Sequence, residues 1–566
     1  MKMFREVIQR ATLVFVATAM WTATAGAQNP AWAKRAAASV FTLKTFDDSG
    51  TLLASSTGCF VSADGEAISS FAPFRGARAA VVIDAQGKEW PFDCLLGAND
   101  TYDVARFKVA TRKAVPVTVA ASPASESATM WMLPYAAKRV AQSRQGTVAR
   151  VENFMEQYSY YTLSLDAGSG NVGCPLLNER GEVVALMQDA ASGADGKSNA
   201  IDVRYAAALS MTALSINDAT FRQTAVDKAV PANINDALLA LYVASSAMDS
   251  MQYVRYLDRF VAQYPTATDG YAYRARHKMS QADFAGADAD MRQAVKMAEK
   301  TDDAHYQYAS IIYQKELYQP EQRYEPWTLQ RAYDEAAEAY RINPMPVYRQ
   351  LQAQVLFAQQ KYEDAFTVYQ ELSGTTLRSA DIFYAASQCQ ARLGNSELQL
   401  AQLDSAVAMF GKPYVRAAAP YIMARAQALH DAGRYRAAVV DYNDYARLMG
   451  SRVAAPFYYL REQAEVGGHL YQQALDDIRR AVDMAPEEPM YLAEQAALET
   501  RLSLYDEANA TAARLVQLAP EVSEGHLFLG LSLCLKGQKK DGLQHLLKAK
   551  ELGHEQAQQL IDKYAQ

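Results

Sequence analysis

The sequence predicts two kinds of structure in succession, a β-rich front part and an all-α repeat behind it. From about residue 36 to residue 188, short runs of β-branched and aromatic residues alternate with polar ones between Asp-Gly, Gln-Gly and Arg-Gly turns. Beyond Pro231, Ala, Leu and Tyr recur with the ~3.6-residue period of an amphipathic helix. Small residues return there at a spacing of about 34 residues. The expected fold class is therefore multidomain, with an all-β barrel or sandwich followed by an all-α superhelix.

The first 27 residues are expected to be a secretory signal peptide rather than part of the fold. Three basic residues lead into an apolar run over residues 11–27, and the small residue Ala27 precedes Gln28. We expect cleavage after Ala27 and export, which in a bacterium places the protein in the periplasm. No later run approaches the ~20 apolar residues of a membrane span, so no integral membrane segment is expected after cleavage.

Composition excludes several function classes. The chain of 566 residues has a formal net charge of −7, which loss of the basic leader makes more negative, so nucleic acid is not the expected partner. It contains no HExxH, CxxC, P-loop or dinucleotide-binding fingerprint. We therefore expect no cofactor and no metal. The sequence leaves the oligomeric state open.

Five cysteines are scattered along the chain, too few for a disulfide scaffold in an exported protein of this length. At least one must be unpaired. One bridge among Cys59, Cys94 and Cys174 stays open, and the simpler expectation is that all are small buried hydrophobic residues.

The change of pattern places a boundary between the two parts. We expect a β domain over residues 28–215, a linker over residues 216–233 and helices over residues 234–566.

The helical part is marked by one position that opens the second helix of each predicted hairpin, usually with a small residue. These positions are Tyr253, Ala287, Ala332, Ala365, Gln399, Ala438, Ala474, Ala508 and Gly542. Longer spacings coincide with two insertions, LYQPEQRYEPW at residues 317–327 and GKPYVRAAAP at residues 411–420. Two helices approach closely only where small side chains face each other, and Pro344, Pro486 and Pro520 end second helices. The segment resembles the tetratricopeptide repeat family over about nine units, which implies a protein or peptide partner in the repeat groove.

Three stretches of the front part resemble trypsin-fold serine proteases, and within them the HtrA-like branch, over about residues 36–210. They are TGCFVSADGEAISSFAPFRGA at residues 57–77, LLGANDTYDVARFKV at residues 95–109 and GSGNVGCPLLNERGEVVALM at residues 168–187. The resemblance implies a double β-barrel. Carried over residue by residue, the catalytic His position falls on Ala72, the Asp position on Asp103 and the Ser position on Val172. The oxyanion hole of the family would be formed by the main-chain N–H groups of Gly170 and Val172.

Two of the three catalytic side chains are thus missing, because a methyl and an isopropyl group supply neither a nucleophile nor a base. All seven His lie at or beyond His277, so no shift of the alignment brings a His into the front domain. Ser169 and Cys174 are the nearest substitute nucleophiles, and neither has an evident base beside it.

These observations predict an exported pseudoprotease domain joined to a tetratricopeptide solenoid, acting as a non-catalytic protein-binding scaffold. The alternative is an active serine-type endopeptidase whose repeats recruit substrate, which would need a His from the repeats, with His277 nearest in sequence. A third interpretation makes the front domain inert and the repeats part of an envelope assembly.

Overall fold

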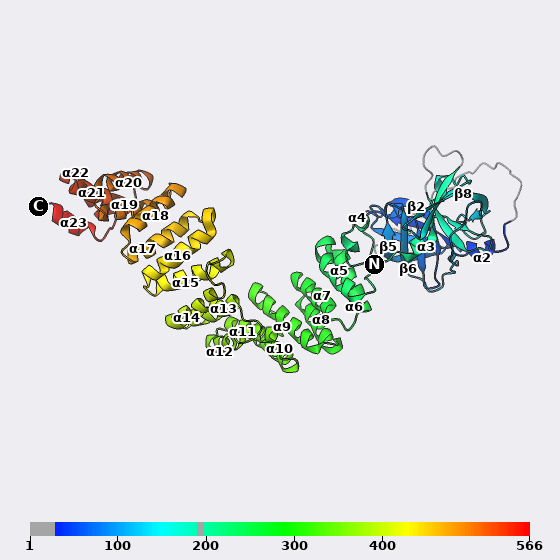
Figure 1. Ribbon diagram of the computed structural model, residues 1–566, viewed down its shortest axis with the longest axis horizontal. Coiled ribbons are helices and arrows are strands. Elements are labelled where there is room, and N and C mark those ends of the chain that lie inside the picture. Colours follow the sequence, from blue (N-terminus) through cyan, green and yellow to red (C-terminus); the bar gives the residue numbers. More distant parts are fainter. Residues whose placement is uncertain (1–28, 189–196, 566) are drawn as a thin grey trace. The chain divides into compact units, whose positions relative to one another are not determined.

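A computed structural model describes residues 29–188 and 197–565, without the side chain of Ser169 (Figure 1). The expected signal peptide lies outside the described residues. The chain forms two compact units, Met1–Ala304 and His305–Gln566, and each is described by itself.

Unit 1 begins with the short helix α2 (Ala33–Ala37) and a closed antiparallel barrel whose strands neighbour one another in the order β1-β2-β3-β6-β5-β4. The strands are β1 (Val40–Phe46), β2 (Leu52–Phe60), β3 (Glu66–Ser69), β4 (Ala79–Ile83), β5 (Glu89–Asn99) and β6 (Val104–Val109). Alternate side chains point inward, so Phe41, Leu43 and Phe107 are fully buried in the barrel. The 3₁₀ turn η1 (Ala72–Phe74) follows β3.

A second closed barrel follows in the order β10-β11-β12-β9-β8-β7. Its strands are β7 (Thr129–Met132), β8 (Arg144–Phe154), β9 (Tyr158–Leu163), β10 (Pro175–Leu177), β11 (Val183–Met187) and β12 (Ser198–Asp202). The 3₁₀ turn η2 (Ser169–Asn171) precedes β10, and helix α3 (Val203–Ala208) follows β12. Val40 and Ile68 of the first barrel share an apolar cluster with Leu186 and Ile201 of the second. The predicted all-β double barrel is therefore confirmed.

The segment expected as a linker, residues 216–233, packs against the first barrel. It contains α4 (Ala219–Arg222) and the end of η3 (Ser215–Asn217). Phe221, Val226 and Val230 belong to the same apolar cluster as the interior of barrel 1. The cluster continues into the first helices of unit 1, α5 (Ile234–Ala247) and α6 (Ser250–Gln263). The domain boundaries proposed at residues 215 and 234 stay a prediction.

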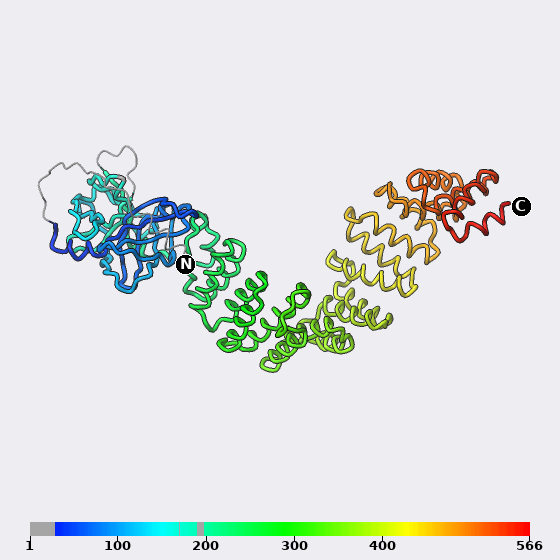
Figure 2. The backbone as a smooth tube through the Cα atoms, turned by 180° about the vertical axis from the view of Figure 1, so that it is seen from behind, coloured from blue at the N-terminus to red at the C-terminus, as the bar shows by residue number. Residues whose placement is uncertain are grey.

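Helices follow one another from α5 to the end of the described chain, as the tube in Figure 2 shows. Unit 1 adds α7 (Thr268–Ser280) and α8 (Phe284–Met297), and α9 (Thr301–Tyr318) leads into unit 2. Unit 2 contains α10 (Leu329–Ile342), α11 (Pro346–Ala358), α12 (Tyr362–Leu372), α13 (Ala380–Arg392), α14 (Ser396–Ala408), α15 (Ala419–Asp431), α16 (Tyr435–Met449), α17 (Ala455–Gly467), α18 (Tyr471–Met484), α19 (Pro489–Arg501), α20 (Tyr505–Leu518), α21 (Ser523–Leu535), α22 (Lys539–Glu551) and α23 (Ala557–Tyr564). The predicted all-α second part is confirmed.

Every position proposed to open a second helix is the fourth residue of an even-numbered helix, from Tyr253 in α6 to Gly542 in α22. Ala474 and Ala508 are fully buried, as close contact between paired helices requires. The first insertion runs from the last two residues of α9 into the loop before α10, and the second runs from the loop after α14 into the first two residues of α15. The helices therefore pair in the register that the sequence predicts.

Paired helices are also joined by buried ion pairs that recur at one spacing. Arg425 of α15 binds Asp441 of α16 through two hydrogen bonds of 2.7 Å. Arg461 of α17 binds Asp477 of α18 in the same way, at 2.5 and 2.7 Å. Such bidentate pairs fix the register of the two helices.

All five cysteines are buried and unpaired, so the disulfide that the sequence left open among Cys59, Cys94 and Cys174 is not formed. Among residues 29–188 and 197–565, no helix has the length and apolar character needed to cross a bilayer.

Candidate functional site

Ala72 and Asp103, the first two positions carried over from the protease resemblance, lie next to each other. Ala72 opens η1 directly after β3, and Asp103 ends the turn between β5 and β6. The main-chain N–H of Ala72 donates a hydrogen bond of 2.6 Å to Oδ1 of Asp103. Asp103 adopts φ +45°, a left-handed conformation that Asp tolerates better than most residues. The two loops are thus joined at the position that the protease resemblance assigns to the catalytic imidazole, and the side chain present there is the methyl group of Ala72.

The pKa of Asp103 depends on burial more than on nearby charges. Burial raises its pKa above the usual range, and the N–H groups of Ala72 and Phe71 oppose that shift by stabilising the ionised form. No imidazole cation is available to pair with it. Asp103 therefore acts here as an acceptor that joins two loops.

Val172, the third position, follows η2 and presents its carbonyl to strand β2. That oxygen accepts hydrogen bonds from the N–H of Thr57 (3.3 Å) and from Oγ of Ser56 (3.0 Å). Ser56 Oγ also lies 2.9 Å from Oγ of Ser70, two residues before Ala72. Because a hydroxyl donates only once, Ser70 donates to Ser56 when Ser56 donates to Val172. Two serine hydroxyls thus link the Val172 loop to the strand that leads to Ala72.

The sequence does not predict the hydrogen bond between the hydroxyls of Ser56 and Ser70. Ser56 stands in the pair Ser55-Ser56 and Ser70 in the pair Ser69-Ser70, which are ordinary strand residues by pattern. Their partners follow from the register of β2 and β3, where Gly58 faces Ser69. No signal in the sequence alone gives that register.

The main chain at residues 168–173 forms a tight loop that includes η2. Gly173 has φ +81°, and a Cβ built on it would stand 2.2 Å from the carbonyl oxygen of Thr57, so only glycine fits there. A Cβ on Gly170 would meet no atom within 4 Å, so the loop leaves open space beside this residue.

Cys174, one of the two substitute nucleophiles, is fully buried. Burial raises the pKa of its thiol to about 12, which leaves almost no thiolate at neutral pH. Its Sγ faces Oδ1 of Asn171 at 3.8 Å rather than a base. The other, Ser169, lies in η2, and its side chain is outside the described atoms.

His277, the histidine nearest in sequence to the front domain, lies in the last turn of α7. Its ring packs edge-on against Tyr253 of α6, with the ring centroids 5.5 Å apart. No described histidine occupies residues 29–188 or 197–276. In the described part of the chain, no three His, Cys, Asp or Glu side chains are grouped as metal ligands.

The comparisons with known proteins agree with the fold. The family model of the trypsin-like peptidase domain matches residues 56–186. Among curated proteins, none matches the sequence.

Solved structures of proteases are similar to the chain at low sequence identity. The active form of the Rv3671c protease from M. tuberculosis is 18% identical, over 35% of this chain and 92% of that one, with a TM-score of 0.28. The serine endoprotease from Yersinia pestis is 16% identical, over 34% and 68% of the two chains, with a TM-score of 0.28. The HtrA-type protease AlgW with a tripeptide is 18% identical, over 31% and 59%, with a TM-score of 0.27. The double barrel and the matched residues together identify the front of the chain as a trypsin-like peptidase domain.

Proposed function

We propose that this chain is a non-catalytic protein-binding scaffold, in which a pseudoprotease domain is joined to a helical repeat that binds a polypeptide. The observation that carries the proposal is the pair Ala72 and Val172 at the base and nucleophile positions. Serine-type hydrolysis needs a hydroxyl to attack the carbonyl and a base to take its proton. Neither side chain supplies such a group.

The surroundings of these two positions support the same conclusion. The hydroxyls of Ser56 and Ser70 are engaged with each other and with the carbonyl of Val172. The nearest carboxyl, Asp103, accepts the N–H of Ala72. The described residues 29–188 and 197–276 contain no histidine, so they supply no imidazole base to activate a hydroxyl.

The amides of Gly170 and Val172 give the domain a binding role that needs no chemistry. A pair of convergent main-chain N–H groups binds a carbonyl or carboxylate oxygen. We propose them as an oxyanion-hole-like contact for a bound peptide, at positions that the protease resemblance assigns to that role.

Tyrosines on the odd-numbered helices of unit 2 support polypeptide binding by the repeat. Three ring contacts join the first helices of successive hairpins, and they are Tyr306–Tyr348 at 5.0 Å, Tyr384–Tyr421 at 6.0 Å and Tyr459–Tyr491 at 5.4 Å. Tyr384 is 37% exposed. Tyrosine combines a large apolar ring with a polar tip, which suits it to binding an extended peptide.

The leader at residues 1–27 supports export, and we propose the periplasm as the place where the protein works. Partners would then be envelope or exported polypeptides. We propose the tetratricopeptide family for the repeat on the period and on the match of every opening position to an even-numbered helix.

Partner capture with a groove variant tests this proposal. The mature chain would capture partners from its envelope fraction, mass spectrometry would identify them, and binding would be remeasured with purified partner. The groove variant is Tyr384→Ala with Tyr459→Ala, and the matched control is Tyr318→Ala, a tyrosine that is 80% exposed at the end of α9.

We expect the groove variant to raise the Kd at least about tenfold, the usual size of a buried tyrosine contact, and the control to leave it unchanged. An unchanged Kd for the groove variant would contradict the proposed binding surface.

A further inference from the structure

Residues 223–230, here called the strap, run beside β5 of barrel 1 and form one isolated parallel bridge with it, between Leu95 and Lys228. Leu95 of β5 donates its N–H to the carbonyl of Asp227 (2.8 Å) and accepts the N–H of Ala229 (2.8 Å). The pairing of β5 with β6 is irregular on both sides of Leu95. The strap therefore satisfies the main-chain N–H and carbonyl of Leu95, between two irregularities of β5.

The start of the strap reaches both loops of the candidate site. The carbonyl of Gln223 accepts the N–H of Gly76, in the loop that contains Ala72. Its side-chain Nε2 donates to Oδ2 of Asp100 (2.9 Å), in the turn that contains Asp103. Arg75 then bridges the two loops through hydrogen bonds of 2.9 and 2.6 Å to Oδ1 of the same carboxyl.

This arrangement keeps Asp100 ionised over a wide pH range. The hydrogen bond from Gln223, followed by that from Arg75, lowers the pKa of Asp100 below its usual range. The link between the loops should therefore persist in mild acid.

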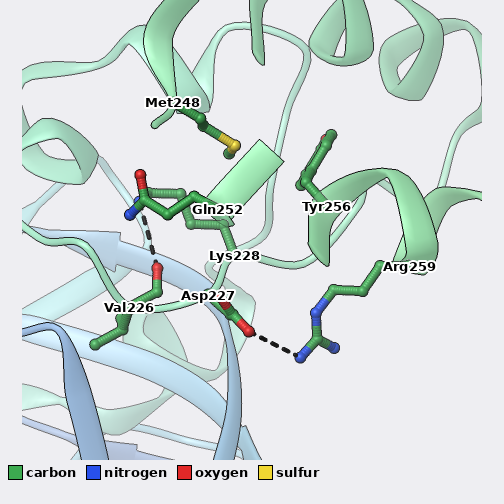
Figure 3. A pocket seen from close by; sticks show the side chains of 7 residues that line it. All are labelled: Val226, Asp227, Lys228, Met248, Gln252, Tyr256 and Arg259. Atoms are coloured by element: carbon green, nitrogen blue, oxygen red, sulfur yellow. Dashed lines mark hydrogen bonds and ion pairs between the residues drawn. The ribbon is translucent and has the colours of Figure 1, made fainter. Parts of the chain in front are cut away.

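Helix α6 holds the strap from its other side (Figure 3). Arg259 donates to the main-chain oxygen of Asp93 (2.6 Å) and to its carboxylate (2.7 Å), and it lies 3.6 Å from Asp227 of the strap. Gln252 donates to the carbonyl of Ala225 at 2.7 Å. The strap is thus fixed between barrel 1 and the first helical pair.

A small cavity of about 10 Å³ lies between the strap and α6, lined by Lys228, Tyr256 and Arg259 among others. Lys228 is 6% exposed, and its Nζ donates to the carbonyls of Thr224 (2.9 Å) and Val226 (3.4 Å). The hydroxyl of Tyr256 is buried without a hydrogen-bond partner, and the cavity has room for about one water molecule. The strap therefore packs closely against α6.

We propose that Gln223 and Arg259 are positioning residues of the candidate site, because they couple helix α6 through the strap to the Ala72 and Asp103 loops. Among the residues that the structure describes, no imidazole joins these loops. Besides the contacts of Ala72 and Phe71 with Asp103, the side chains of Arg75 and Gln223 join the two loops at Asp100. The first helical pair thereby sets the geometry of the binding loops, whether or not the domain hydrolyses peptides.

Hydrogen exchange measured by mass spectrometry on the whole chain tests this coupling. The variants are Arg259→Ala, its conservative counterpart Arg259→Lys, and Gln223→Ala. The control is Arg150→Ala, which removes an exposed ion pair with Glu152 on barrel 2. Exchange in residues 71–77 and 99–103 is compared with exchange in β1, which reports general loss of stability.

We expect Arg259→Ala to speed exchange about tenfold in the strap and in both loops, because charge-assisted hydrogen bonds are lost. Strand β1 and the control should not change, and Arg259→Lys should show a smaller effect. Faster exchange confined to α6 and the strap, or equal acceleration of β1, would overturn the proposal.

If Arg259→Ala fails to fold, the hydrogen exchange of Gln223→Ala tests the coupling instead. Exchange in its residues 71–77 and 99–103 should be faster, while α5 and α6 keep their protection from exchange. Unchanged exchange in residues 71–77 and 99–103 of Gln223→Ala would overturn the proposed coupling.

Discussion

The N–H of Ala72 donates a 2.6 Å hydrogen bond to Oδ1 of Asp103, so the carboxyl that the protease resemblance assigns to the catalytic Asp accepts a main-chain N–H. In a working triad that carboxyl orients an imidazole. Here it joins two loops, and we expect its replacement to change the stability of unit 1.

Asp103→Asn should therefore be tolerated and should slightly stabilise unit 1 at pH 7. Burial raises the pKa of Asp103 in the folded chain, so its contribution to stability is complete below the unfolded pKa and is lost as pH rises through the folded value. The amide mimics the neutral acid and avoids that loss. Thermal unfolding at pH 7 and pH 3.5 checks this, with a difference of up to about 1 kcal/mol at pH 7 that vanishes at pH 3.5. A clear destabilisation at pH 7 would show that the ionised form is what the loops need.

Ala474→Arg should destabilise unit 2 by about 3 kcal/mol or more. Ala474 is fully buried at the fourth residue of α18, where a long charged side chain has no room and no partner. Ala513→Arg on α20 is the matched control, because Ala513 is exposed. Urea unfolding compares them, and near-wild-type stability of Ala474→Arg would mean that the helix pairs do not pack as described.

Much of the helical part could be predicted because close helix packing favours small residues at regular intervals in the sequence. A small residue such as Ala474 stands near the start of the second helix in most hairpins, so the period and the helix starts can be predicted from the sequence. In the front part, the alternation of β1 and the Asp-Gly turn before β3 predict strands for the same reason.

The contacts of the strap could not be predicted, since it bonds to Leu95 through its main chain. Residues such as Ala225 and Ala229 show no period of their own, and their pairing depends on a bulge elsewhere in β5. The hydroxyl link between Ser56 and Ser70 is invisible for a similar reason, because it depends on strand register. The positions Ala72, Asp103 and Val172 came from resemblance, and the structure shows the first two in contact.

Glu462→Gln should flatten the pH dependence of unit 2. Glu462 is fully buried on α17 with one carboxyl oxygen unpartnered, and burial followed by the charge of Glu494 raises its pKa to about 8. Its stabilising contribution is complete below the unfolded pKa near 4.5 and is lost as pH rises to about 8, with a slope of at most ~1.4 kcal/mol per pH unit.

Urea unfolding of unit 2 followed at Trp327 from pH 5 to pH 9 measures this slope. Glu465, whose pKa burial also raises to about 8, should leave a residual dependence in the single variant. An unchanged slope in Glu462→Gln combined with Glu465→Gln would contradict the assignment.

Lys228→Met should stabilise the contact between the strap and α6 at neutral pH. Burial lowers the pKa of Lys228 to about 8, so the wild type gains stability only as pH rises from about 8 towards the unfolded value of 10.5. The apolar variant should show no such gain and should be more stable by on the order of 1 kcal/mol at pH 7. Hydrogen exchange of residues 223–230, measured in the wild type and in Lys228→Met at pH 7 and pH 9.5, tests this difference. Loss of protection in Lys228→Met would mean that the hydrogen bonds to Thr224 and Val226 outweigh the cost of burial.

The most direct test of the central claim is peptide-bond hydrolysis by the purified mature chain, measured on unfolded casein together with labelling by a fluorophosphonate probe. We predict neither cleavage nor labelling, because loss of nucleophile and base removes a factor on the order of 10⁶ in turnover in the well-studied subtilisin case. Val172→Ala serves as the control, since a contaminating protease would be unaffected by it. Cleavage or labelling that survives repurification, and that disappears in Ser169→Ala or Cys174→Ala, would contradict the pseudoprotease proposal and identify the nucleophile.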